Sequence, residues 1–163
     1  MAAKPSASRA GRDLSASRGR QLGSTETWYA EIVDSALAQR IIAHYFQDKP
    51  GIVAVYLFGS FAKGGARADS DVDVGVLFQV TPPATLLEQP FAAEADLAEE
   101  LARPVQVIAM NRAPADLVHR ILRDGILVLE KDKSRRIAFE VRSRNEYFDL
   151  LPMLRQYRKR ANS

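Results

Sequence analysis

Two short apolar runs on either side of a polar, glycine-rich segment restrict the folds open to this chain more than any other feature. The runs, IVAVYLF at residues 52–58 and DVDVGVLF at residues 71–78, contain many β-branched and aromatic residues and predict two strands. Aspartate is disfavoured in strands, yet Asp71 and Asp73 occupy alternate positions at the start of the second run. Their placement indicates a function for this strand beyond packing.

The alternation assigns the acidic residues to one face of the predicted strand. Residues two apart share a face, so the valines at 72, 74 and 76 are expected in the core and the two aspartates on the opposite face. Their Cα atoms would lie roughly 6.5 Å apart. Two carboxylates this close repel each other unless a cation compensates. A hard divalent ion with oxygen ligands fits, and Mg²⁺ is the natural choice beside phosphates.

Gly59 and Ser60 follow the first predicted strand, and ten residues separate Ser60 from Asp71. Glycine permits close backbone approach to a ligand, and a serine hydroxyl with nearby backbone N–H groups can bind phosphate oxygens. Beside the aspartates, the pair predicts a site for a metal-bound triphosphate. The segment fits neither a Walker A loop, which needs Lys-Ser/Thr after its second glycine, nor a G-x-G-x-x-G fingerprint. The simpler alternative is a surface turn at residues 69–71 with an exposed Asp73.

The rest of the chain predicts an α/β domain with a small mixed sheet of about four strands flanked by helices. Two further strands are expected at 104–110 and 126–130, and the loop at 61–69 can hold one helical turn. Helices are expected at 25–47, at 84–102 with an interruption near Pro90, at 113–125, and at 132–160 with a bend at Pro152.

Composition separates a basic N-terminal segment from the domain. Residues 1–24 carry five basic residues and one acid but almost no large apolar side chains, and are interpreted as a disordered extension. The domain is assigned to residues 25–160. Without the extension the net charge falls from +3 to −1, which argues against nucleic-acid binding by the domain. The absence of cysteine suits a cytoplasmic protein, and no apolar stretch approaches the roughly 18 residues of a membrane span.

The stretch GSFAKGGARADSDVDV resembles the signature of the polymerase-β-like nucleotidyltransferases, in which Gly-Ser precedes Asp-x-Asp by ten residues. Its detailed form is similar to the minimal nucleotidyltransferase (MNT) group, and the resemblance extends over residues 50–130. The matching positions beyond Gly59 and Ser60 are Ala62, Lys63, Gly64, Ala66, Arg67, Ser70, Asp71 and Asp73.

The resemblance implies a polymerase-β-like fold and Mg²⁺-dependent transfer of AMP from ATP to a protein hydroxyl. Gly59 and Ser60 would bind the nucleotide, and Asp71 and Asp73 would be the catalytic, magnesium-binding residues. Many MNT proteins are antitoxins of HEPN-domain ribonuclease toxins, which makes a HEPN toxin the expected partner. Whether the chain also forms a homo-oligomer stays open.

One position departs from the family pattern. The family usually supplies a third carboxylate from a later strand, but here that strand reads VQVIAM, with Gln106 and Ala109 where acids are expected. Glutamine brings no charge and cannot act as a general base near neutral pH. Glu94, Asp96, Glu99 and Glu100 lie on a predicted helix, which argues against substitution by any of them. The alternatives are therefore a nucleotide-binding antitoxin that neutralises its partner by binding and, less favoured, a transferase for a small molecule such as an aminoglycoside.

Overall fold

The computed structural model describes residues 34–67, 70–82 and 90–161. The basic extension predicted at 1–24 and the part of the first helix predicted at 25–33 lie outside the described residues. So does the part of the third predicted helix before Pro90.

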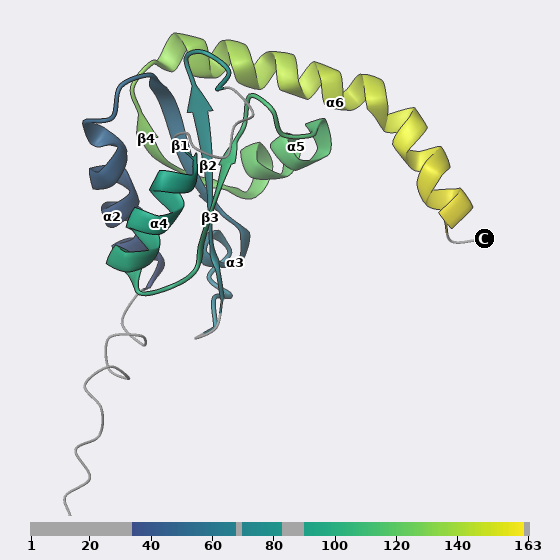
Figure 1. Ribbon diagram of the computed structural model, residues 1–163. Helices are drawn as coiled ribbons and strands as arrows, with labels where there is room; N and C mark the ends of the chain where they lie inside the picture. Colours follow the sequence, from purple (N-terminus) through teal and green to yellow (C-terminus); the bar gives the residue numbers. More distant parts are fainter. Residues whose placement is uncertain (1–33, 68–69, 83–89, 162–163) are drawn as a thin grey trace, which may run out of the picture.

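A four-stranded mixed sheet forms the centre of the described domain (Figure 1). Its strands are β1 (Ile52–Phe58), β2 (Val72–Phe78), β3 (Val105–Ala109) and β4 (Ile126–Glu130), in the order β3-β2-β1-β4. β1 pairs antiparallel with both β2 and β4, whereas β2 and β3 are parallel. The predicted α/β fold with a small mixed sheet is confirmed.

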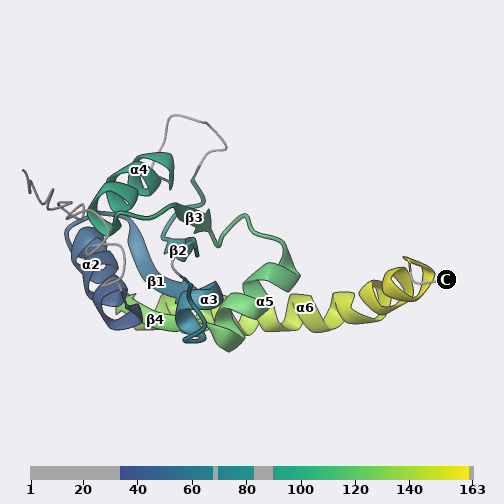
Figure 2. The same ribbon diagram turned by 90° about the horizontal axis from the view of Figure 1, so that it is seen from below.

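Helices cover both faces of the sheet (Figure 2). Within the described residues they are α2 (Ser35–Gln47), α3 (Gly59–Ala62), α4 (Pro90–Leu101), α5 (Ala115–Asp124) and α6 (Lys133–Ala161). None of them is long and apolar enough to cross a membrane. The C-terminal part of α6 extends away from the sheet, in yellow in both views.

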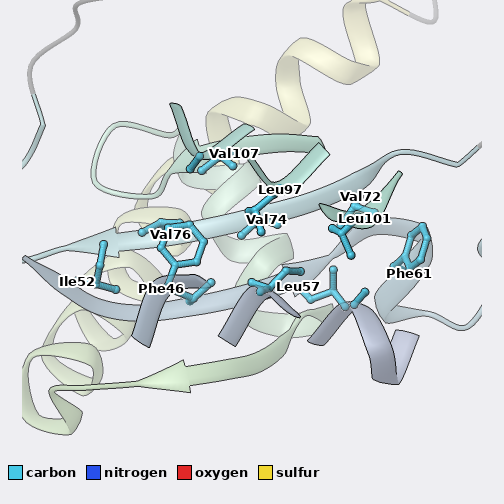
Figure 3. Packing of buried hydrophobic residues seen from close by; sticks show 14 of the residues in the cluster. Phe46, Ile52, Leu57, Phe61, Val72, Val74, Val76, Leu97, Leu101 and Val107 are labelled. Atoms are coloured by element: carbon cyan, nitrogen blue, oxygen red, sulfur yellow. The ribbon is translucent and has the colours of Figure 1, made fainter. Parts of the chain in front are cut away.

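Two apolar clusters fix the sheet between these helices. On one face, Val72, Val74 and Val76 of β2 pack with side chains of α2 and α4, among them Phe46 and Leu97 (Figure 3). On the other face, side chains from α5 and α6 pack against the sheet in a smaller cluster that includes Val118, Ile121 and Phe139. The predicted alternation is confirmed within β2, since its valines face the larger cluster and Asp73 lies on the face that α5 covers.

The first helix differs from the prediction of a continuous helix at 25–47. Asp34 has extended backbone angles (φ −84°, ψ 173°), and its side chain accepts a hydrogen bond from the Leu37 N–H at 2.7 Å. Asp34 is therefore an N-cap, and α2 begins at Ser35. An aspartate inside a periodic apolar pattern was the available signal, because its short side chain competes for backbone N–H groups.

Within the described residues, β1 and β4 have the predicted bounds and the other boundaries differ by a residue or two. Pro90 is the first residue of α4, a position where its missing N–H leaves no hydrogen bond unmade. α6 continues through Pro152 and curves in its C-terminal part (Figure 1). Asp71 precedes the first residue of β2 instead of beginning the strand.

Candidate functional site

A pocket of about 410 Å³ lies at the end of β1. Residues of β2 and β3 line it on one side and residues of α5 on the other. Its lining combines one glycine with polar and charged side chains, namely Gly59, Lys63, Asp73, Gln106, Arg120 and Asp124. A second cavity of about 420 Å³ lies beside α6 and is lined by Asn111, Arg135 and Arg142 among others. The described lining of the second cavity includes no carboxylate. The first pocket contains Gly59 and Asp73 of the motif and is therefore the candidate site.

Gly59 and Asp73 are in direct contact at this pocket. Gly59 has a φ of +72°, and a Cβ built there would lie 2.1 Å from the Asp73 Oδ2. The contact follows from the sheet register, because Asp73 of β2 lies opposite Phe58, the last residue of β1. Glycine is therefore required at position 59 for two reasons: its left-handed backbone and the space that the Asp73 carboxylate occupies.

Asp71 lies close enough to Asp73 to affect its ionisation. Burial raises the pKa of Asp73 above the usual aspartate value, and the charge of Asp71 raises it further. Asp73 is half-buried, whereas Asp71 is exposed. A divalent cation bound by both carboxylates would remove their repulsion, so this donor pair fits Mg²⁺. In the described part of the chain, no group of three or more His, Asp or Glu residues could hold a metal ion.

Gln106 occupies the position beside Asp73 on the neighbouring strand. In the parallel pairing of β2 and β3 the two residues are register partners, and both line the pocket. Ala109 is the register partner of Val76 and packs against the larger apolar cluster on the opposite face. Of the two positions where the family resemblance predicts an acid, only position 106 therefore faces the pocket.

Two of the helical acids considered as substitutes have other roles. The Val107 N–H donates to the Glu94 Oε1 at 2.8 Å, and the Tyr45 hydroxyl donates to the Asp96 Oδ2 at 2.7 Å. Both contacts tie α4 to its neighbours on the face of the sheet away from the pocket. This agrees with the expectation that their helix keeps them out of the site.

Hydrogen bonds hold the described residues between Ser60 and Asp71. The Ser60 carbonyl accepts from the Gly65 N–H at 3.1 Å, and the Arg67 N–H donates to the Ser70 Oγ at 2.8 Å. The buried Arg103 reaches the same turn, where its Nη1 donates to the Arg67 carbonyl at 3.1 Å. Arg67 and Ser70 thus shape the turn before Asp71. Ser60 and Asp71 are not among the described residues that line the pocket.

The sequence motif assigns no role to Arg120 and Asp124, and Lys63 enters it only as a matching position. Leu117, Arg120 and Asp124 all line the pocket from α5. Their spacing of three and four residues places them on one helix face, a signal available in the sequence. Nothing in the sequence indicated that this helix face lies against the Gly-Ser and Asp-x-Asp motif.

The Asp73→Asn variant is expected to be more stable than the wild type at pH 7. A carboxyl whose pKa is raised by folding is less easily ionised in the folded chain, so stability decreases as the pH rises from the unfolded pKa through the folded one. Asparagine removes this effect. We expect a melting temperature higher by on the order of 1–3 °C at pH 7. At a pH below about 4, the ordinary aspartate pKa, we expect no difference.

The matched control for this measurement is Asp149→Asn, an exposed position on α6. It should leave the melting temperature unchanged at both pH values. A lower melting temperature for Asp73→Asn at pH 7 would show that the ionised carboxylate stabilises the fold, contrary to the argument from burial.

Comparison with known proteins gives a match to one family model. The profile described as "Polymerase beta, Nucleotidyltransferase" matches residues 40–134, more than half of the chain. No curated protein matches.

Solved structures share the fold at low sequence identity. A toxin–antitoxin crystal structure with AMP-PNP superposes with a TM-score of 0.68 at 21% identity, over 77% of this chain and 98% of that one. A structure of the MntA-HepT toxin–antitoxin gives 0.64 at 19% identity, over 78% and 99%. A structure of a tri-AMPylated Shewanella oneidensis HEPN toxin with its MNT antitoxin gives 0.62 at 20% identity, over 79% and 99%.

Proposed function

Because the chain belongs to the polymerase beta nucleotidyltransferase family, we propose that it transfers AMP from ATP to a protein hydroxyl, with Mg²⁺, as the antitoxin of a HEPN-type ribonuclease toxin. The observation that carries the proposal is the contact between Gly59 and the Asp73 carboxylate in a pocket that also contains Lys63 and Arg120. This contact brings together the Gly-Ser half of the motif, which is suited to phosphate, and the Asp-x-Asp half, which is suited to a metal ion.

Asp71 and Asp73 would hold the magnesium ion. When bound, it would neutralise phosphate charge and polarise the α-phosphate. Gly59 leaves the space in which the Asp73 carboxylate lies, and the hydroxyl of Ser60, the next residue in the chain, is proposed to bind phosphate. The reaction would form a bond between the acceptor oxygen and the α-phosphorus, break the bond to the β-phosphate oxygen, and release pyrophosphate. The acceptor proton must leave in the same process.

Gln106 limits how that proton can be removed. Its carboxamide lies beside Asp73 on the pocket face but cannot accept the proton near neutral pH. The chain's own contribution would then be positioning and charge neutralisation. This feature favours the second candidate function, an antitoxin that binds nucleotide but neutralises its partner by binding.

The proposed partner rests on the structures with the same fold. These structures are of toxin–antitoxin pairs, one with AMP-PNP and one with an AMPylated HEPN toxin in complex with an MNT antitoxin. In this chain, α6 leaves Val141, Phe148 and Met153 more than half exposed, an apolar surface that a partner protein could cover. We expect the pair to act in the cytoplasm, where ATP and RNA are available.

The test is co-expression of this chain with the protein of the adjacent reading frame, which the proposal expects to be a HEPN protein, followed by mass spectrometry of that partner. We expect AMP on a tyrosine of the partner with the wild-type chain, at a low level because of Gln106, and none with Asp73→Asn. Co-purification of the two proteins without AMP on the partner would instead support neutralisation by binding. If the two proteins do not associate and the partner carries no AMP, both functions are contradicted.

A further inference from the structure

Arg103 lies at the corner between α4 and β3, and its backbone is fixed by the way α4 ends. Ala102, the residue after the helix, has a left-handed φ of 51°. Its N–H donates to the Glu99 carbonyl at 3.4 Å, and the Arg103 N–H donates to the Ala98 carbonyl at 3.3 Å. This pair of hydrogen bonds is the Schellman arrangement with which many helices end. The Arg103 side chain therefore starts from a fixed point of the backbone.

The guanidinium of Arg103 contacts two parts of the segment that carries the motif. Its Cζ lies 5.5 Å from the ring centroid of Phe61, the residue after Ser60. Its Nη1 donates to the Arg67 carbonyl at 3.1 Å, and the same carbonyl accepts a hydrogen bond from the Ser70 N–H at 3.1 Å. Arg103 is only 8% exposed, so water competes little for these contacts. The guanidinium thus links the Gly-Ser end of the segment to the turn before Asp-x-Asp.

The residue after Arg103 holds the other side of Asp71. The Pro104 carbonyl accepts a hydrogen bond from the Val72 N–H at 2.9 Å. The corner therefore contacts the chain both before Asp71, at the Arg67 carbonyl, and directly after it. Asp71 is exposed and precedes the first residue of β2, so strand pairing alone does not set where its carboxylate lies. The corner supplies a constraint that the sheet does not.

We propose that Arg103 is a positioning residue for the metal site, which holds the segment before Asp71 so that its carboxylate lies beside that of Asp73. The inference rests on the proposed function and adds to it a residue that acts through another. Arg103 is not among the described residues that line the pocket, so its effect on metal binding passes through the residues that it contacts. A planar guanidinium suits this role, because its N–H groups can donate to a carbonyl while the group also lies against an aromatic ring.

The experiment is titration calorimetry of the full-length chain with ATP at a series of Mg²⁺ concentrations, at a temperature at which every variant is folded. Arg103→Met should raise the Mg²⁺ concentration for half-maximal binding about tenfold, as loss of a residue that supports a metal ligand does. Arg103→Lys keeps the charge and should raise it only about two- to fivefold. In the Asp71→Asn background, Arg103→Met should add less than about twofold, because the ligand through which Arg103 acts is already lost.

A matched control separates positioning from general stability, because loss of a buried charged side chain also destabilises the fold. Phe46 belongs to the same apolar cluster as Phe61 but lies at its other end (Figure 3). Phe46→Leu should lower the melting temperature and leave the Mg²⁺ requirement unchanged. Should Arg103→Met fail to fold, Arg103→Lys carries the comparison.

Amide hydrogen exchange without nucleotide gives a second readout. The N–H groups of Ser70 and Val72 should exchange about tenfold faster in Arg103→Met than in Phe46→Leu, because the segment around Asp71 is then held less firmly.

Three results would overturn the inference. They are an unchanged Mg²⁺ requirement in both Arg103 variants, an equal increase in Phe46→Leu, and a full tenfold effect of Arg103→Met in the Asp71→Asn background. Absence of Mg-ATP binding by the wild type would instead reject the proposed function. Hydrogen exchange would then still decide whether Arg103 holds the segment, since unchanged exchange at Ser70 and Val72 would contradict it.

Discussion

Replacement of both Asp71 and Asp73 by asparagine is expected to abolish magnesium-dependent ATP binding. The two carboxylates are the proposed metal ligands, and the ionisation of Asp73 already responds to Asp71. Substitution of residues that only support metal ligands costs 10–100-fold in affinity, so loss of both ligands should exceed about 100-fold. Calorimetry with ATP, with and without Mg²⁺, measures the effect.

Thermal unfolding distinguishes loss of ATP binding from loss of the folded structure. Since asparagine at position 73 is expected to stabilise the domain, thermal unfolding should show that the double variant is folded. A matched pair of changes, Asp132→Asn and Asp149→Asn, removes two acids from α6 and the turn before it and should leave Mg-ATP binding unchanged. The assignment of Asp71 and Asp73 would be wrong if the double variant at these two positions kept the wild-type affinity.

The Gln106→Asp variant is expected to increase AMP transfer to the partner. Gln106 lies beside Asp73 on the neighbouring strand, and both line the same pocket, so an aspartate there would add a carboxylate next to the proposed metal ligands. General-base assistance contributes about 10²–10⁴-fold to reactions of this kind. The measurement is the rate at which AMP appears on the purified HEPN partner, followed by mass spectrometry.

Gln79→Asp is the matched control, because Gln79 is exposed and lines the other cavity. It should leave the transfer rate unchanged. Fast transfer by the wild type that does not rise in Gln106→Asp would show that the chain needs no third carboxylate. Stable association of the two proteins with no transfer by either chain would favour neutralisation by binding alone.

Much of the fold follows from local pattern. The β-branched runs predicted β1 and β2, and the alternation of valine and aspartate predicted which face of β2 is buried, because residues two apart in a strand share a side. Local pattern does not locate a helix boundary where a single side chain competes for the backbone N–H groups. Asp34 caps α2 by accepting a hydrogen bond from the Leu37 N–H, so the helix begins at Ser35, a boundary that apolar periodicity does not indicate.

The motif alone brought Gly59, Ser60, Asp71 and Asp73 forward as one site, because their residue types and spacing carry the chemistry of phosphate and metal binding. Only the tertiary structure decided which other residues join them. The parallel pairing of β2 with β3 places Gln106 beside Asp73 and turns Ala109 to the opposite face. The packing of α5 on the sheet brings Arg120 and Asp124 to the pocket from about fifty residues away. Such contacts depend on strand order and helix packing, which local sequence patterns do not specify.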